Sequence, residues 1–97
     1  FNNCREGFYM KFINQEVFLT GIEERVTQKG NTYCVVTVIG CNGGSSITCM
    51  YTGDFKELER EYLQFIAKNP FVPVFADFEY TDGQYSRFVS TRIVIKK

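Results

Sequence analysis

Aromatic and basic side chains recur together around two turns of this sequence. An aromatic ring exposed on a strand can stack on a nucleobase, at about 1–3 kcal/mol per base, and a neighbouring cation can neutralise a phosphate. Each ring also has a structural alternative, because aromatic side chains dominate cores, cross-strand pairs and subunit contacts. The residues that we predict to contact single-stranded nucleic acid are Lys29, Tyr33, Tyr80, Tyr85, Arg87, Phe88 and Arg92.

Groups suited to catalysis or metal binding are sparse. The sequence contains no histidine and therefore lacks the commonest general base at neutral pH. The glycine- and serine-rich segment 42–46 lacks the lysine and the following helix of a phosphate-binding loop. Cys4, Cys34, Cys41 and Cys49 include no Cys-x-x-Cys pair suited to zinc. We predict a chain that is not an enzyme and that uses no metal, cofactor or small-molecule substrate.

The cysteines also bear on the cellular compartment. Two disulfides would suit a secreted chain, whereas Cys34 and Cys49 fall in apolar strand segments where a buried thiol acts as a small hydrophobic group. We favour reduced thiols and a cytoplasmic location. No uncharged apolar run approaches the roughly 18–20 residues of a membrane-spanning helix. The Phe1 start, without an apolar leader, indicates a trimmed N-terminus rather than a signal peptide.

Strands are the first elements predicted to position these residues. The 97 residues are 44% hydrophobic, which is enough for one core and a single domain over 1–97. Segment 8–13, within 1–15, predicts an N-terminal extension or an edge strand that ends at Asn14 and Gln15. Segment 16–26 predicts a long first strand with a bulge at Gly21, and segments 32–39 and 47–52 predict the second and third strands.

One helix is predicted after the third strand. Asp54 is a favourable N-cap residue, and Glu57 follows three residues later as in a capping box. Pro70 ends the helical pattern, and two more strands follow across a turn near Gly83. This order predicts an all-β fold, a five-stranded barrel of the oligonucleotide/oligosaccharide-binding (OB) type with the helix between its third and fourth strands. A plain meander with the helix across one face is the alternative.

Alternation along each strand predicts which side chains face outward. In the second strand, the apolar pattern turns Tyr33 away from the core. In the last strand, three residues are expected in the core, namely Val89, Ile93 and Ile95. Three others are expected on the outer, ligand-facing surface, namely Phe88, Ser90 and Arg92.

The segments VFLTGI, YTGDFKELEREYLQFI and FVPVFADF resemble the single-stranded DNA-binding protein family of bacteria, phages and plasmids, over about residues 16–97. That family has V-x-L-x-G in its first strand, an aromatic-Gly-Lys step into a helix that ends in Tyr-Leu, and a V-x-V-x-G type of fourth strand. The resemblance implies an OB barrel that coats and protects single-stranded DNA during replication, as a homo-oligomer. The matching positions are Val17, Leu19, Gly21, Gly53, Glu57, Tyr62, Leu63, Val72 and Val74.

The chain also departs from the family pattern. Thr52 stands where the family has a stacking aromatic, with Tyr51 one residue earlier, and Asp54 replaces the lysine. The sequence contains no tryptophan. The resemblance therefore implies a divergent member, of the kind that a mobile element encodes.

Charge leaves two functions open. Eleven basic and eleven acidic residues give no net charge, which excludes the strong positive field of a typical duplex-DNA binder. The acids concentrate on the predicted helix and the basic residues on the last strand, so one face can still be basic. We expect a sequence-tolerant protein that binds single-stranded DNA, or RNA, without membrane attachment. The alternative is a protein-binding or assembly module on the same barrel.

Overall fold

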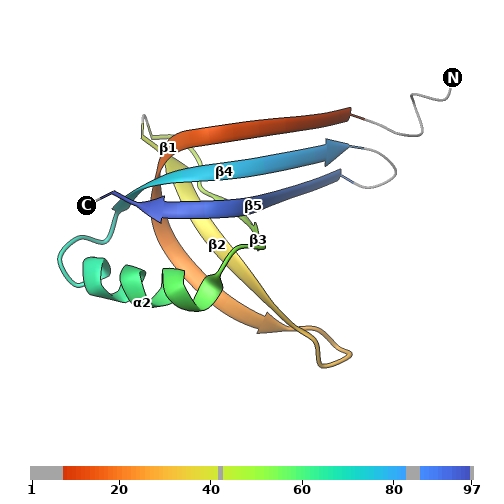
Figure 1. Ribbon diagram of the computed structural model, residues 1–97, viewed down its shortest axis with the longest axis horizontal. Coiled ribbons are helices and arrows are strands. Elements are labelled where there is room, and N and C mark those ends of the chain that lie inside the picture. Colours follow the sequence, from red (N-terminus) through yellow and green to blue (C-terminus); the bar gives the residue numbers. More distant parts are fainter. Residues whose placement is uncertain (1–7, 42, 83–85, 97) are drawn as a thin grey trace, which may run out of the picture.

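The computed structural model describes residues 8–41, 43–82 and 86–96. The described residues form five strands and one helix, with the helix after the third strand, as Figure 1 shows. Their bounds are β1 Phe8–Val26, β2 Thr32–Gly40, β3 Ile47–Tyr51, α2 Phe55–Ile66, β4 Val72–Asp82 and β5 Ser86–Ile95.

Strand β1 belongs to two parts of the barrel. Its first half pairs with β4 and its second half with β2, both in antiparallel register. The register shifts between Phe12 and Gln15, where Asn14 has a φ of 54°, and again between Leu19 and Gly21. The second shift confirms the bulge predicted at Gly21. Segment 8–13 is a strand continuous with the rest of β1, so the predicted end at Asn14 is wrong, because an irregular pairing bends a strand without ending it.

Strands β3 and β5 close the barrel. They pair in parallel, Met50 with Val89 and Tyr51 with Ser90. The order around the closed barrel is β1-β2-β3-β5-β4, which differs from a plain meander because β5 lies between β3 and β4. The predicted fold class is confirmed: the described residues form an all-β, five-stranded, OB-like barrel with the helix between the third and fourth strands.

The core lies inside the barrel and follows the alternation of the strands. In β4, every second residue from Val72 to Phe78 is buried. Leu19 of β1 and Val36 of β2 are fully buried against them, and Tyr51 of β3 belongs to the same cluster. Each fully buried aliphatic side chain contributes roughly 1.5–3 kcal/mol relative to an exposed one.

Helix α2 lies below the barrel in Figure 1 and buries one face in the core. The backbone N–H of Glu57 donates to Oδ1 of Asp54 at 3.2 Å, so the predicted N-cap is confirmed. Phe55, Leu58 and Tyr62 are the helix residues that are buried in the core cluster. The remaining face of α2 carries most of its charged side chains.

A bulge in β5 overturns part of the predicted alternation. Asp77 pairs with Arg92 and Phe78 with Ser90, so Thr91 is an extra residue between them. A bulge reverses which side chains face inward on its far side. Ser90 is therefore 0% exposed, and its hydroxyl donates to the backbone carbonyl of Asp77 at 3.1 Å. The predictions that Ser90 and Phe88 face outward and that Val89 faces the core are wrong, because they assumed an unbroken alternation.

The described cysteines are free thiols: Cys49 is buried, Cys34 is half-buried and Cys41 is exposed. The structure therefore does not contain the pair of disulfides that was the alternative for the four cysteines. Within residues 8–41, 43–82 and 86–96, no helix has the length and apolar character needed to cross a membrane.

Candidate nucleic-acid interface

One row of paired residues crosses the outer surface of the barrel. Val35 of β2 pairs with Glu23 of β1 and with Met50 of β3, and Met50 pairs in turn with Val89 of β5. Directly paired residues point to the same side of a sheet, and the sequence neighbours of Val35, Met50 and Val89 are buried inside the barrel or packed against its core. The row therefore faces outward. We call its apolar middle, Val35, Met50 and Val89, the outer band.

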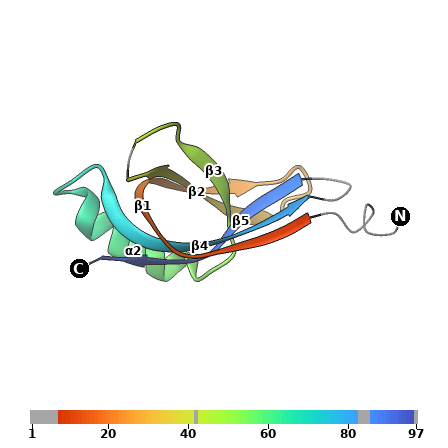
Figure 2. The ribbon, with the colours of Figure 1, turned by 90° about the horizontal axis from the view of Figure 1, so that it is seen from above.

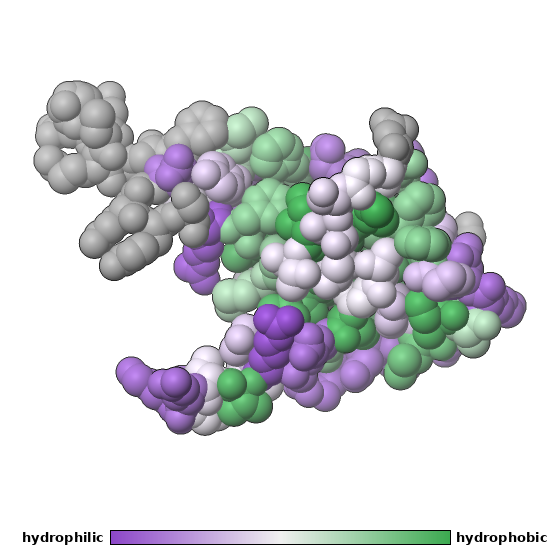
Figure 3. Space-filling model, turned by 180° about the vertical axis from the view of Figure 1, so that it is seen from behind, coloured by the Kyte–Doolittle hydropathy of each residue, from purple (hydrophilic) through white to green (hydrophobic). Residues whose placement is uncertain are grey.

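The outer band lies between two projections of the molecule. Figure 3 shows the side of the barrel formed by β2 and β3, with apolar residues at its centre. The outline is indented between the tip of the β1–β2 hairpin and the arm formed by β4 and β5 with the first half of β1. Val35 is only 5% exposed, and Met50 and Val89 are half-buried. The band is thus a shallow apolar floor with a polar wall on each side.

Tyr33 stands on the wall formed by the β1–β2 hairpin. It is half-buried, pairs with Arg25 across the hairpin, and lies two residues before Val35 on the same outer side of β2. Arg25 contacts Glu23 at 3.1 Å, and this hydrogen bond and charge raise the pKa of Arg25, with a smaller contribution from the Tyr33 hydroxyl. The predicted residue Lys29 is exposed at the tip of the same hairpin, where Gly30 has a φ of 89°.

Arg87 stands on the opposite wall, at the start of β5. It is exposed and pairs with Thr81, which pairs with Tyr9 of β1. Lys11 of β1 is also exposed and pairs with Glu79, the residue beside Val89 in β4. Within the described residues, Lys11 and Arg87 form no ion pair. The predicted residue Tyr85 lies outside the described residues.

Tyr80 and Phe88 lie on the inner side of the β4–β5 arm, away from the outer band. They pair across the two strands, with ring centroids 6.4 Å apart. Phe88 also stacks on Phe78 at 5.2 Å and is tilted against Phe12 at 6.5 Å. Phe88 packs against the core, so its ring is held within the protein rather than presented beside Tyr33.

Arg92 is exposed but separated from the other predicted residues by the bulge at Thr91. Its guanidinium lies 3.6 Å from the Asp77 carboxylate and 3.4 Å from Oδ1 of Asn14. The Asp77 carboxylate also accepts from the Asn14 backbone N–H at 2.8 Å. Arg92 therefore holds the bend of β1 against β4 and β5, which is a structural role.

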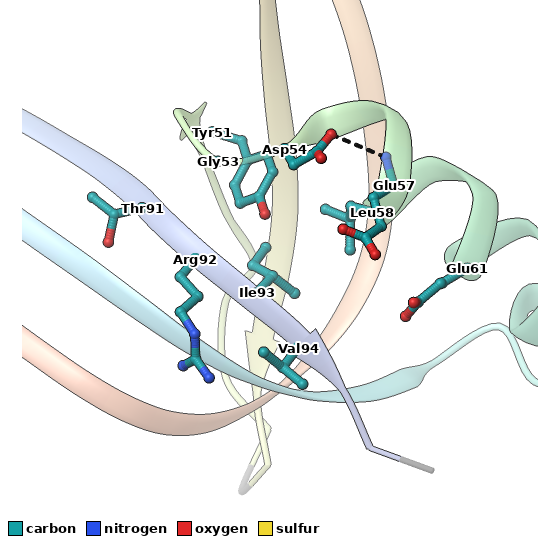
Figure 4. Close-up of a pocket in the computed structure, with 10 residues that line it drawn as sticks. All are labelled: Tyr51, Gly53, Asp54, Glu57, Leu58, Glu61, Thr91, Arg92, Ile93 and Val94. Atoms are coloured by element: carbon teal, nitrogen blue, oxygen red, sulfur yellow. Dashed lines mark hydrogen bonds between the residues drawn. The ribbon is translucent and has the colours of Figure 1, made fainter.

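A groove of about 390 Å³ separates the first turns of α2 from β5. Figure 4 shows Glu57 and Glu61 on its helix side and Thr91, Arg92 and Val94 on its strand side. Asp54 lines it as well and accepts the N-cap hydrogen bond. Three carboxylates on one wall would repel phosphate, so we place the nucleic-acid interface on the outer band and not in this groove.

The sequence could not identify several residues of the interface. Arg25, Met50 and Val89 join it because of the pairing register between strands, which no local pattern encodes. Tyr9 and Lys11 join it because segment 8–13 pairs with β4. The basic and aromatic types of these residues were visible in the sequence, but their position beside the outer band was not.

Burial sets the chemistry of the titratable groups in the barrel. It raises the pKa of the Cys49 thiol to about 11, and it raises the pKa values of Tyr51 and Tyr62. Among the described residues, no group of three or more histidine, cysteine, aspartate or glutamate side chains is arranged to hold a metal ion.

Comparisons with protein-family models, curated proteins and solved structures find no match to this chain.

Proposed function

We propose that this chain binds single-stranded DNA on the outer band, without catalysis and with little preference for sequence. The observation that supports the proposal is the outer band itself, an apolar floor on an OB-like barrel with Tyr33 and Arg25 on one wall and Arg87 and Lys11 on the other. Flat and apolar groups favour the bases, and the flanking cations favour the phosphates.

Sequence tolerance follows from the chemistry of this floor. Its central side chains are aliphatic or thioether groups, which contact any base without a fixed hydrogen-bonding pattern. The hydroxyls of Thr37 and Thr48, which pair next to Val35 and Met50 on β2 and β3, lie 3.0 Å apart and bond to each other. Glu23 at one end of the row is neutralised by Arg25. Bases would therefore be held by packing and stacking, and affinity would depend on the backbone charge of the strand.

The proposal includes membership of the single-stranded DNA-binding protein family and self-association in a reducing cytoplasm. Three observations support these parts: the OB-like strand order, the free thiols, and the first half of β1. Among the residues that the structure describes, segment 8–12 pairs with β4 on one side, whereas β2 pairs with β1 only from Val17 onward. An unpaired strand edge is a site where a second chain can add a strand.

Fluorescence anisotropy with a labelled oligo-dT of about 30 nucleotides tests the binding, since that length exceeds the site of one barrel. We expect saturable binding to the single strand, weaker binding to a duplex, and a marked loss of affinity between about 50 and 150 mM salt. Oligo-U in place of oligo-dT distinguishes RNA from DNA. Absence of binding at the lower salt concentration contradicts the proposal.

A matched pair of variants locates the contact. Tyr33→Ala should weaken binding roughly 5- to 150-fold if one base stacks on that ring. Leu63→Ala removes a side chain that is 60% exposed on α2, far from the outer band, and should leave the affinity unchanged. Equal effects of the two substitutions would mean that Tyr33 does not contact the strand.

A protein-binding module is the second candidate. The observation that favours it is the acidic residue at each end of the apolar row, Glu23 and Glu79, in a chain with no net charge. A contact of this kind depends on apolar burial and should change little with salt, whereas nucleic-acid binding weakens steeply. The salt series described above therefore separates the two candidates.

A further inference from the structure

The groove between α2 and β5 borders a strand edge that β3 leaves open. Strand β3 pairs with β5 only at Met50–Val89 and Tyr51–Ser90, and the chain then continues into α2. Figure 1 shows α2 alongside the second half of β5, with both elements running in the same direction, and Figure 2 shows the pair from above. The space between them is the groove of about 390 Å³ described above, which shares no residue with the outer band.

The hydrogen bonds of β5 show which of its backbone groups face this groove. The Lys96 N–H donates to the Pro73 carbonyl at 3.0 Å, on the side of β4. Backbone groups of successive strand residues point to opposite edges, so Ile93 and Ile95 direct theirs away from β4. The Tyr51 hydroxyl bonds to the Ile93 backbone N–H. Within the residues that the structure describes, the Ile93 carbonyl and the Ile95 N–H have no partner strand on that side.

These two backbone groups match the needs of one more strand residue. In a parallel pair, a residue of one strand donates its N–H to a carbonyl of the other strand and accepts from the N–H two residues further along. Strand β3 already pairs with β5 in parallel. A short extended segment can therefore continue this pairing beyond Ser90. Main-chain bonds to an open strand edge are a common way of binding a peptide.

The side chains that line the groove suit a cation with an aliphatic stem. Buried core side chains form its floor, namely Tyr51, Leu58 and Ile93. The helix wall carries three carboxylates, namely Asp54, Glu57 and Glu61. Glu61 is half-buried and forms no ion pair with any residue that the structure describes. The one base in the lining, Arg92, lies 3.6 Å from the Asp77 carboxylate and so is already neutralised.

The spacing of the carboxylates indicates which cation fits. Among the described residues, no three acidic side chains are arranged to hold a metal ion. Glu57 and Glu61 are about 6 Å apart along the helix axis, at 1.5 Å per residue. Alternate residues of an extended chain are roughly 6.6 Å apart and point the same way. Two basic residues separated by one other residue therefore match the pair of glutamates.

We propose that this groove binds an extended basic segment of a partner protein, with a lysine or arginine at every second position. The segment adds to the open edge of β5 at Ile93 and Ile95, and two of its cations meet Glu57 and Glu61. The aliphatic stems of these cations pack on the apolar floor. The same carboxylates repel phosphate, so a partner protein and a nucleic-acid strand would bind this chain at separate sites.

Fluorescence anisotropy with the labelled peptide Gly-Lys-Val-Lys-Val-Lys-Gly tests this binding without nucleic acid, so the result does not depend on the proposed function. At about 50 mM salt we expect saturable binding with a Kd of about 10–500 µM, as for a small transient contact. The reordered peptide Gly-Val-Val-Lys-Lys-Lys-Gly should bind at least about fivefold more weakly, because adjacent side chains of an extended chain point to opposite sides. Equal binding of the two peptides, or no binding of the first, overturns the proposal.

Variants of α2 locate the bound peptide. Glu61→Gln should weaken binding roughly threefold, and Glu57→Gln/Glu61→Gln roughly tenfold, as expected for one and two ion pairs at a surface. Glu59→Gln removes the same charge from a part of α2 that does not line the groove, and should leave the affinity unchanged. Circular dichroism checks that the variants fold. Equal losses in Glu59→Gln and Glu61→Gln would place the peptide outside the groove.

Backbone methylation tests the addition to β5. A peptide that carries methyl groups on its three central backbone nitrogens keeps its charges but loses those N–H donors. We expect it to bind at least about fivefold more weakly than the unmodified peptide, since the Ile93 carbonyl then lacks its donor. Undiminished binding would show that the segment does not pair with the edge of β5, and would overturn that part of the proposal.

Discussion

Replacing Gly53 with alanine should destabilise the barrel, and the structure gives the reason. Gly53 links β3 to α2, and a Cβ atom there would lie 2.5 Å from the Tyr51 hydroxyl oxygen and 2.6 Å from the adjacent ring carbon. The Thr91 carbonyl oxygen would be 3.0 Å away on the other side. Tyr51 is buried in the core cluster beside the β3–β5 closure, so moving its ring disturbs the packing of the core. The added methyl group must therefore displace the ring or the strand.

The expected cost of Gly53→Ala is about 1–3 kcal/mol, the usual range for overpacking a core. For a domain of this size that cost lowers the melting temperature by roughly 5–20 °C. Gly21→Ala is the matched control, because the nearest atom to its Cβ is a Thr37 carbon at 3.7 Å, an ordinary contact. Thermal unfolding followed by circular dichroism measures both variants.

The double variant Gly53→Ala/Tyr51→Phe sharpens this prediction. Removing the hydroxyl relieves the contact at 2.5 Å but leaves the ring carbon at 2.6 Å, so the two substitutions should show coupling with only partial recovery. A Gly53→Ala variant that melts at or above the wild-type temperature would show that the added methyl group meets no steric barrier, because alanine would then have gained from a less flexible unfolded chain.

Three further predictions concern the helix cap and the thiols. Asp54→Ala should lower the free energy of unfolding, measured with urea, by about 1 kcal/mol, since the Glu57 N–H loses its acceptor. Asp54→Asn should retain most of that stability. The pKa of Cys49 is about 11 in the folded chain, against 9.0 for an unperturbed thiol, so the folded state binds more protons between these values. The protonated Cys49 thiol should therefore contribute roughly 3 kcal/mol to the free energy of unfolding below pH 9, and this contribution should be lost as the pH rises through 11. The Cys49→Ala variant should not show this loss. Exposed Cys41 should react with a thiol reagent at once, and buried Cys49 only after unfolding; equal rates would contradict the burial.

Much of the fold was predictable because local chemistry and apolar spacing agree. Asp54 and Glu57 marked the start of the helix, and the alternation of β4 identified its buried side. Gly21 marked the bulge in β1, because a glycine has no side chain to hinder the bend of the strand. The bulge at Thr91 could not be predicted, because no glycine or polar pattern distinguishes it from a regular strand. One unmarked residue was enough to reverse the expected direction of Ser90 and Phe88.

The candidate interface was only partly predictable, for a related reason. The outward direction of Tyr33 follows from the alternation of its strand alone, and the structure places this residue beside the outer band. Met50 and Val89 lie next to each other through the parallel pairing of strands that are far apart in the sequence. Tyr80 and Phe88 are aromatic residues of the type that stacks on bases, but here they pair with each other and with core rings. Residue type indicated the chemistry, and the register between strands determined the location.

An NMR titration of the labelled chain with a short oligo-dT locates the bound strand residue by residue, and a protein of 11.2 kDa is well suited to it. We expect chemical-shift changes at Tyr33, Val35, Met50 and Val89, with little change at Phe75 on the opposite side of the barrel. Changes confined to the outer side of β4 around Phe75, or no changes at low salt, would contradict the proposal that the outer band binds single-stranded DNA.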